Sequence, residues 1–422
     1  ALPSAAVAMA PPNSMKPLHR IGPSPPPLSP TMALQPAAGA RDLQPGAVES
    51  NRRISELLAG VYRLWGYQEV TPPTIERLTS LEAGGAINSS EILRLAADDP
   101  LGLRPELTAP IARAACSRMR GRPRPLRLWA CGTTFRTSTG DGGAQRIHEE
   151  LQSGVELLGV GSAAADTELL QLLLAAVATL GLQERHQPTL LVGHHGLLDA
   201  LLNPAAAAER SAIRQALTDF DPLALEQIPL PAAQRDQFRS LLALRGEPKR
   251  VLDQLEQWLG PIPLLQSLAD TLAAVGPAAA ERGVRLQLDP SFQPHFDLYD
   301  GLVFRLVCQG HAAPVAIASG GRYDALVGRF GAAVEQAAGT GFGFAIEPIR
   351  ELLEDADPPA LPAAWLVAAA PGVDPALLLS QQARLHQRGE AAELCLSHCA
   401  NKAEAEMVAA ERGCRGTVWV AS

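Results

Sequence analysis

Residues 127–159 read RLWACGTTFRTSTGDGGAQRIHEELQSGVELLG, and this stretch decides the fold. Its first part, 128–136, carries aromatic and threonine side chains that suit the pleated surface of a strand. Residues 137–145 contain three glycines and little to bury, which predicts a polar loop. A second strand follows the loop. The sequence therefore predicts a long β-hairpin as the centre of the fold.

Side chains of the second strand alternate between its two faces. Leu151, Val155 and Leu157 fall on one face, whereas Gln152 and Glu156 fall on the other. An amide and a carboxylate that point the same way, beside apolar packing, suit a small polar ligand lying on a sheet. A solvated hairpin face would show the same pattern, so this stretch alone leaves both interpretations open.

Composition limits the class of protein. With 422 residues, 47% hydrophobic and 19% charged, the chain is typical of a soluble protein of about two or three domains. A net charge of −8 argues against a strongly nucleic-acid-binding surface, which needs clustered Lys and Arg. The longest apolar stretch, 169–182, is shorter than the roughly 18 residues of a membrane span. It predicts a buried helix, and we expect no membrane contact.

Six cysteines lie along the chain without a C-x-x-C pair. Cys395, His398, Cys399 and Cys414 are the best candidates for metal ligands, but Cys395 falls in an apolar run that resembles a strand. We therefore expect no metal and no cofactor. Scattered thiols suit a reducing compartment, so a cytoplasmic location is expected.

The chain resembles class II aminoacyl-tRNA synthetases of the histidyl branch. The matching segments, in order, are GARDLQP (39–45), GYQEVTPPTIE (66–76), LGLRPELTAPIARA (101–114), the Phe135-Arg136 pair with 151–159, HFDLYDGLVFRLV (295–307), ASGGRYDAL (318–326) and GTGFGFAIEPIREL (339–352). The resemblance implies an α+β fold in which helices flank an antiparallel sheet, and usually a homodimer. We expect Gly320-Gly321 to form a tight turn.

The chain divides into four predicted parts. Residues 1–37 are rich in Pro and Ala and are expected to be disordered. The synthetase-like core spans 38–351, with an inserted, largely helical region at about 187–288. Residues 352–362 read as a linker. Residues 363–422 alternate strands and helices and predict a small α/β unit.

The resemblance assigns a histidine-binding constellation to this sequence. Glu106 and Thr108 would hold the α-amino group. They lie two residues apart, so on an extended chain they would face the same side. A carboxylate beside a hydroxyl can accept hydrogen bonds from an ammonium. Gln152 would help with the polar end of the amino acid, and Arg136, a retained cation, is expected among the histidine-binding residues.

The same resemblance assigns the imidazole to Glu156 and Tyr299, while Tyr323 would help to wall the pocket. Imidazole offers one donor and one acceptor, and a carboxylate with a phenol can satisfy both.

The catalytic residues of a synthetase are missing. The family needs cations that stabilise charge on the α-phosphate. Pro348 stands at the position of one such arginine, Pro294 at that of another, and Ser138 at that of an acidic residue. We therefore expect no catalytic residues.

A preserved ligand site without the chemistry resembles the regulatory subunits of ATP phosphoribosyltransferase, which are paralogues of histidyl-tRNA synthetase. That resemblance implies a short-form catalytic partner subunit, self-association as a dimer, L-histidine as effector in histidine biosynthesis, and no tRNA. A divergent histidyl-tRNA synthetase and a free-standing histidine- or nucleotide-binding module are the alternatives.

Overall fold

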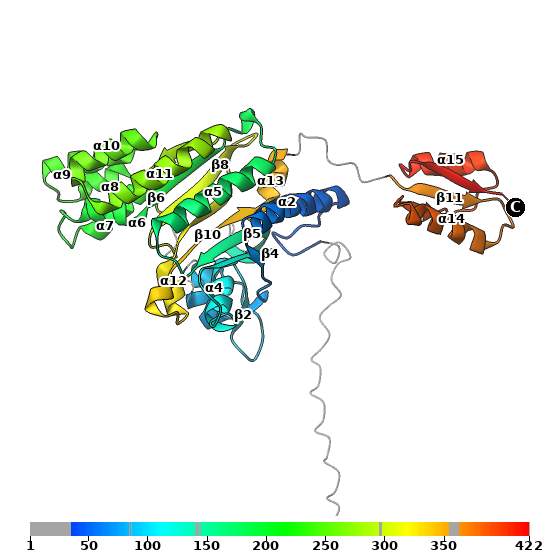
Figure 1. Cartoon of the computed structure of the whole chain (residues 1–422), viewed down its shortest axis with the longest axis horizontal. Coiled ribbons are helices and arrows are strands. Elements are labelled where there is room, and N and C mark those ends of the chain that lie inside the picture. The colour runs from blue at the N-terminus through cyan, green and yellow to red at the C-terminus, as the bar shows by residue number, and fades with distance from the viewer. Residues whose placement is uncertain are drawn as a thin grey trace, which may run out of the picture.

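The computed structural model describes residues 35–83, 85, 87–139, 143, 145–294, 298–353 and 363–421. Its centre is an eight-stranded sheet in the order β1-β4-β5-β10-β9-β8-β6-β7, in which β1 is the short strand Gln68–Glu69 (Figure 1). The inner pairs are antiparallel, and only the pairs β1·β4 and β6·β7 at the two ends are parallel. The expected antiparallel sheet with flanking helices is confirmed. The predicted tail before residue 35, Asp297 of the 295–307 segment and most of the predicted linker lie outside the described residues.

The predicted hairpin consists of β4 (Leu126–Thr139) and β5 (Gln145–Leu158). The two strands pair along their whole length, from Leu126 opposite Leu158 to Thr139 opposite Gln145. Both strands are longer than we predicted, because polar residues at 137–139 pair with 145–147 in place of forming a loop. Backbone pairing needs no apolar side chain, so the polar composition of this segment concealed the strand.

The two faces of the sheet are covered by different helices. On one face, α2 (Pro45–Leu64), α5 (Ala163–Thr179) and α13 (Ile346–Leu353) pack on Trp129, Val155 and Phe342. On the other face, α4 (Thr108–Ser117) and α12 (Asp324–Arg329) pack on Leu128 and Leu158. The predicted alternation in β5 is confirmed, because Leu151 and Val155 face α2 and α5.

Helix α2 begins at Pro45, and only part of its apolar face is buried. Ile54, Leu58 and Val61 are buried, whereas Leu57 is 37% and Leu64 87% exposed. These residues all follow helical spacing, but only the i, i+4, i+7 row Ile54, Leu58 and Val61 is buried. With Val48, which is 41% exposed, three large apolar side chains of this helix are left at the surface.

Helix α5 is the buried helix that we predicted from the apolar stretch. Asp166 lies in the first turn of the helix, where a negative charge is favourable, and its carboxylate pairs with Arg322 of the sheet. None of the helices in the described ranges combines the length and apolarity needed to cross a membrane.

The inserted region is helical only in its middle. Its first and last segments form β6 (Thr189–His194) and β7 (Arg285–Leu288), which extend the main sheet. Between them lie α6 (His195–Leu202), α7 (Arg210–Thr218), α8 (Pro222–Gln227), α9 (Ala232–Ala243), α10 (Pro248–Leu259) and α11 (Pro263–Glu281). Figure 1 shows α7–α10 gathered at the β6 end of the sheet.

Our prediction of a tight turn at Gly320-Gly321 is wrong. Both glycines lie inside β9 (Pro314–Arg322), between β8 (Leu302–Gln309) and β10 (Gly339–Ala345). A Cβ atom at Gly320 would lie 2.6 Å from the Cβ of Phe342. The pair is therefore required by close approach of the neighbouring strands and not by backbone turning.

Residues 363–421 form the expected small α/β unit. A three-stranded parallel sheet has the order β12 (Ala392–Leu394), β11 (Trp365–Ala369), β13 (Gly416–Val420). Helix α14 (Pro375–Gln387) supplies Leu385 to a cluster with Val367, and α15 (Lys402–Glu411) supplies Ala405 to a cluster with Ala368. Since side chains of β11 alternate, the two helices cover opposite faces.

Candidate functional site

A cavity of about 80 Å³ lies on the α4 face of the main sheet, above β5 and β10. It is lined by Glu106, Leu107, Thr108, Arg136, Gln152, Gly154, Glu156, Leu298, Tyr299, Ser319, Phe342 and Gly343. Six of the seven side chains that we predicted for the ligand site therefore meet in one cavity. The seventh, Tyr323, lies behind the lining and hydrogen-bonds Glu156.

Glu106 is held by the N-terminus of α4. Its carboxylate accepts from the backbone N–H of Thr108 at 2.5 Å and of Ala109 at 3.1 Å. The expectation of an extended chain at 106–108 is wrong, because the helix begins at Thr108. The two side chains still reach one cavity, since the carboxylate turns back to cap the helix.

Glu156 is the most deeply buried acid of the cavity, at 1% exposure. Burial raises its pKa from 4.5 to about 8, opposed by hydrogen bonds from Tyr323 and Thr108, while the negative charge of Glu106 adds to the increase. Burial also raises the pKa of Glu106, opposed by the Ala109 and Thr108 amides. Two carboxyls thus face one small space, and a positively charged ligand would relieve both.

Three glycines make the room that these side chains occupy. A Cβ atom at Gly341 would overlap Oε2 of Glu156, and one at Gly339 would overlap the ring of Tyr323. At Gly321 a Cβ atom would lie 2.8 Å from Cδ1 of Tyr299. The sequence analysis did not assign Gly339 and Gly341 to the site, although the alternating glycines of GTGFGF (339–344) carry the signal.

Tyr299 presents its phenol to the cavity. Burial raises its pKa above the usual value of 10, and the negative charges of Glu156 and Glu106 act in the same direction. The hydroxyl therefore stays protonated and can donate. The cavity pairs this neutral donor with acidic acceptors.

Arg136 and Gln152 border the same cavity. The Nε of Arg136 donates to the backbone oxygen of Pro105 at 3.1 Å, which ties β4 to the segment before α4. The amide of Gln152 donates to Oε2 of Glu150 at 2.6 Å, on the same side of β5. Each side chain is thus oriented by a neighbour.

A second cavity, of about 340 Å³, adjoins Arg136. Four carboxylates line it, and Pro348 is among its walls. The acidic residues are Glu149, Glu150, Glu347 and Glu351, against Arg41 and Arg136 as cations. The hydroxyl of Ser138 forms a hydrogen bond with Nε2 of His148, at 2.6 Å. Carboxylates therefore outnumber cations around this cavity, which disfavours an unaccompanied polyphosphate there.

A model of the histidyl-tRNA synthetase family matches residues 39–349. The chain is 53% identical to the ATP phosphoribosyltransferase regulatory subunit of Prochlorococcus marinus (strain MIT 9303), over 92% of this chain and 100% of that protein. It is 51% identical to the subunit of the same name from Synechococcus sp. (strain CC9902), with the same coverage. The chain belongs to the ATP phosphoribosyltransferase regulatory subunits. It is a regulatory subunit of histidine biosynthesis and not itself the catalyst.

Solved structures agree on the fold. An ATP phosphoribosyltransferase regulatory subunit/histidyl-tRNA synthetase from Bacillus halodurans superimposes with a TM-score of 0.77 at 23% identity, covering 92% of this chain and 98% of that one. Histidyl-tRNA synthetase from Nostoc sp. PCC 7120 gives 0.72 at 17% identity, covering 92% of each chain. The regulatory subunit thus has a class II synthetase fold, as we expected.

Proposed function

We propose that this regulatory subunit binds L-histidine in the cavity between β5, β10 and α4, and that it makes a short-form catalytic subunit of ATP phosphoribosyltransferase active and sensitive to histidine. The observation that carries the proposal is the pair of buried carboxyls, Glu106 and Glu156, facing one cavity with Tyr299. A ligand with one ammonium and an imidazole matches their charge and hydrogen-bonding capacity.

The pose follows from the side chains. The α-ammonium lies against Glu106 and Thr108 at the start of α4. The α-carboxylate points to Arg136 and Gln152. The imidazole then reaches Glu156, which accepts from one ring nitrogen, while the Tyr299 hydroxyl donates to the other. Tyr323 holds Glu156 in place from behind.

Histidine can inhibit only if it binds the inactive arrangement of the complex more tightly than the active one. The coupling is reciprocal, so substrates bound to the catalytic subunit weaken histidine binding by the same factor. A coupling of about 1–3 kcal/mol corresponds to several-fold to a hundredfold in affinity.

Several features support the rest of the proposal. Leu57 and Leu64 on α2 are exposed and offer an apolar surface for a dimer. Six free thiols favour a reducing, cytoplasmic setting. The chain carries a net charge of −8 and therefore does not favour tRNA as its partner.

The test mixes the two purified subunits and assays phosphoribosyl-ATP formation with and without histidine. We expect the catalytic subunit to gain activity on mixing, and histidine to reduce it. A catalytic subunit that is fully active alone, and unchanged by this chain at any histidine concentration, contradicts the proposal.

A separate assay checks the lost chemistry. We expect no histidine-dependent exchange of pyrophosphate with ATP, because Pro348 supplies no charge and the adjoining cavity is acidic. Each missing contact to developing charge costs about a hundred- to a thousandfold in rate. Exchange at the rate of an authentic synthetase run in parallel would oppose this assignment.

A further inference from the structure

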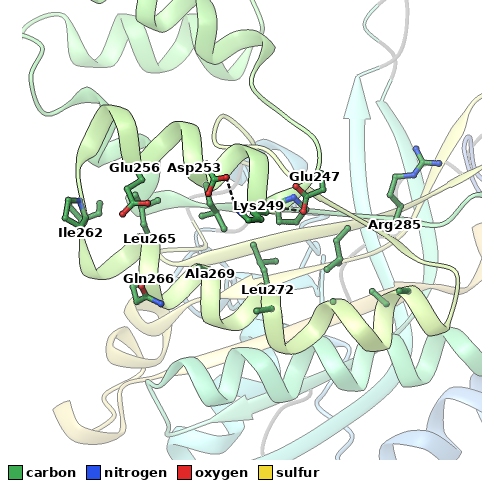
Figure 2. Close-up of a pocket in the computed structure, with 18 of the residues that line it drawn as sticks. Glu247, Lys249, Asp253, Glu256, Ile262, Leu265, Gln266, Ala269, Leu272 and Arg285 are labelled. Carbon is green, nitrogen blue, oxygen red and sulfur yellow. Dashed lines mark hydrogen bonds and ion pairs between the residues drawn. The ribbon is translucent and has the colours of Figure 1, made fainter.

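A cavity of about 930 Å³ lies between α10 and α11 of the inserted region (Figure 2). Its walls are largely apolar, and the ion pair of Lys249 and Asp253, 2.8 Å long, lies along one of them. Apolar walls beside a neutralised ion pair do not select one ligand. The small α/β unit of residues 363–421 holds a more specific arrangement, which is formed by two cysteines.

The thiols of Cys395 and Cys399 are in direct contact. Their Sγ atoms are 3.5 Å apart, close enough for one thiol to donate a hydrogen bond to the other. The thiol of Cys414 donates instead to Oε1 of Glu393, at 3.4 Å. The described ranges contain no group of three histidine, cysteine or acidic side chains that could hold a metal. Of the cysteines that we considered as metal ligands, Cys395 and Cys399 thus form a dithiol pair.

The loop between the two thiols is short and fixed at both ends. Cys395 directly follows β12, and its N–H donates to the backbone oxygen of Val367 in β11 at 2.8 Å. Two residues beyond Cys399, the side chain of Asn401 caps α15 by accepting from the N–H of Glu404 at 3.0 Å. An S–S bond is about 2 Å long, so the sulfur atoms must approach each other by only about 1.5 Å to form one.

The residues of the loop itself can accommodate this approach. Leu396, Ser397 and His398 are all exposed, Leu396 at 93%. No packing contact of a buried side chain has to break when they move. A small reagent can therefore reach the thiol pair from the loop side.

Exposure gives the two thiols different roles. Cys395 is half-buried, whereas Cys399 is 6% exposed and packs with Ala368 and Ala405. Burial raises the pKa of the Cys399 thiol, and its hydrogen bond with Cys395 acts in the same direction. The thiolate is the nucleophile in exchange with a disulfide. Cys395 is thus the thiol that an oxidant meets first, and Cys399 is the second.

We propose that Cys395 and Cys399 are a redox site that forms a reversible intrachain disulfide with a small disulfide oxidant such as oxidised glutathione. The thiolate of Cys395 attacks one sulfur of the oxidant, whose S–S bond breaks and releases one thiol. The thiolate of Cys399 then attacks Sγ of the mixed disulfide and releases the second thiol. The two protons of the cysteines end on the released thiols, and the oxidant gains two electrons.

This inference does not depend on the proposed function, because neither cysteine lines the histidine cavity. The disulfide joins the end of β12 to the segment before α15 and fixes the exposed residues 396–398 between them. A thiol in excess reverses the reaction by the same two exchange steps.

The experiment incubates the reduced full-length chain with oxidised glutathione, alkylates the remaining thiols after acid quenching and unfolding, and maps the peptides by mass spectrometry. We expect a disulfide between Cys395 and Cys399, with alkylation of these two residues reduced at least tenfold and restored by dithiothreitol. Cys414→Ser, which removes a half-buried thiol outside the pair, is the matched control and should behave as wild type.

Two further variants test the order of the steps. In Cys399→Ser we expect the reaction to stop at a glutathione adduct on Cys395. In Cys395→Ser we expect Cys399 to react at least tenfold more slowly than Cys395 does in the first variant. A stable glutathione adduct on Cys395 of the wild type, or a reaction at Cys414 as fast as at Cys395, overturns the proposal. The wild-type peptide map decides this even if a variant fails to fold, which circular dichroism detects.

Discussion

The hydroxyl of Tyr323 donates a hydrogen bond to the carboxyl of Glu156 across the main sheet, and both side chains are 1% exposed. Tyr323 directly follows β9 and Glu156 belongs to β5, so β10 lies between the two strands. The contact is possible because Gly339 and Gly341 leave space on that strand. A buried acid is therefore satisfied by a neutral donor and not by a cation.

The state of Glu156 should make stability depend on pH. Its pKa rises from 4.5 to about 8 on folding, so the folded protein holds this proton more tightly than the unfolded chain. The stabilisation is present below pH 4.5 and is lost as pH rises through about 8. We expect Glu156→Gln, which cannot ionise, to gain stability relative to wild type over this window, by up to about 5 kcal/mol.

Urea unfolding of both proteins at several pH values measures this difference. Glu335→Gln, at an exposed position, is the control and should run parallel to wild type. A Glu156→Gln curve that also runs parallel to wild type would mean that Glu156 is ionised in the folded protein.

Gly341 and Gly343 allow a test of the space on β10. A Cβ atom at Gly341 overlaps Glu156, whereas one at Gly343 has no atom within 4 Å. We expect Gly341→Ala to lower the free energy of unfolding by about 1–3 kcal/mol and Gly343→Ala to leave it nearly unchanged. Thermal unfolding followed by circular dichroism compares them. Equal losses would show that the strand needs glycine for a reason other than Glu156.

Much of the fold follows from the sequence because the deciding signals are local. The hairpin, the buried α5 and the alternating elements of residues 363–421 appear as periodic patterns. The errors arise where neighbours decide. Gly320-Gly321 has the composition of a turn, but adjacent strands require it inside β9.

The ligand residues were predictable only through the resemblance to a family. No spacing in the sequence connects Glu106 with Glu156 or Tyr299, because three separate elements bring them together. The capping role of Glu106 was not predicted, because we expected an extended chain at 106–108 and the structure has the start of α4 at Thr108.

The pair of Asp166 and Arg322 should be important for stability. Their side chains are 14% and 10% exposed and the ion pair is 2.7 Å long. Removing one partner of a buried pair costs about 3–5 kcal/mol, and Asp324 retains part of the interaction here. We expect Asp166→Ala to lose about 3 kcal/mol in urea unfolding. Glu49→Ala breaks an exposed pair with Arg52 and should lose less than about 1 kcal/mol. Similar losses would contradict the assigned burial.

Histidine binding tests the roles of Glu156 and Tyr299 separately. Glu156→Ala removes the buried carboxyl that accepts from the imidazole, and we expect a loss of about 1.5–3 kcal/mol in binding free energy. Tyr299→Phe keeps the ring and removes one neutral donor, so the expected loss is about 0.5–1.5 kcal/mol. Titration calorimetry measures both, with Glu335→Ala as the control. An amino acid without the two ring nitrogens should bind the wild type more weakly than histidine does. In both variants the difference in affinity between the two amino acids should be smaller. If wild type and variants bind histidine equally, the effector sits elsewhere, and a subunit interface becomes the site to examine.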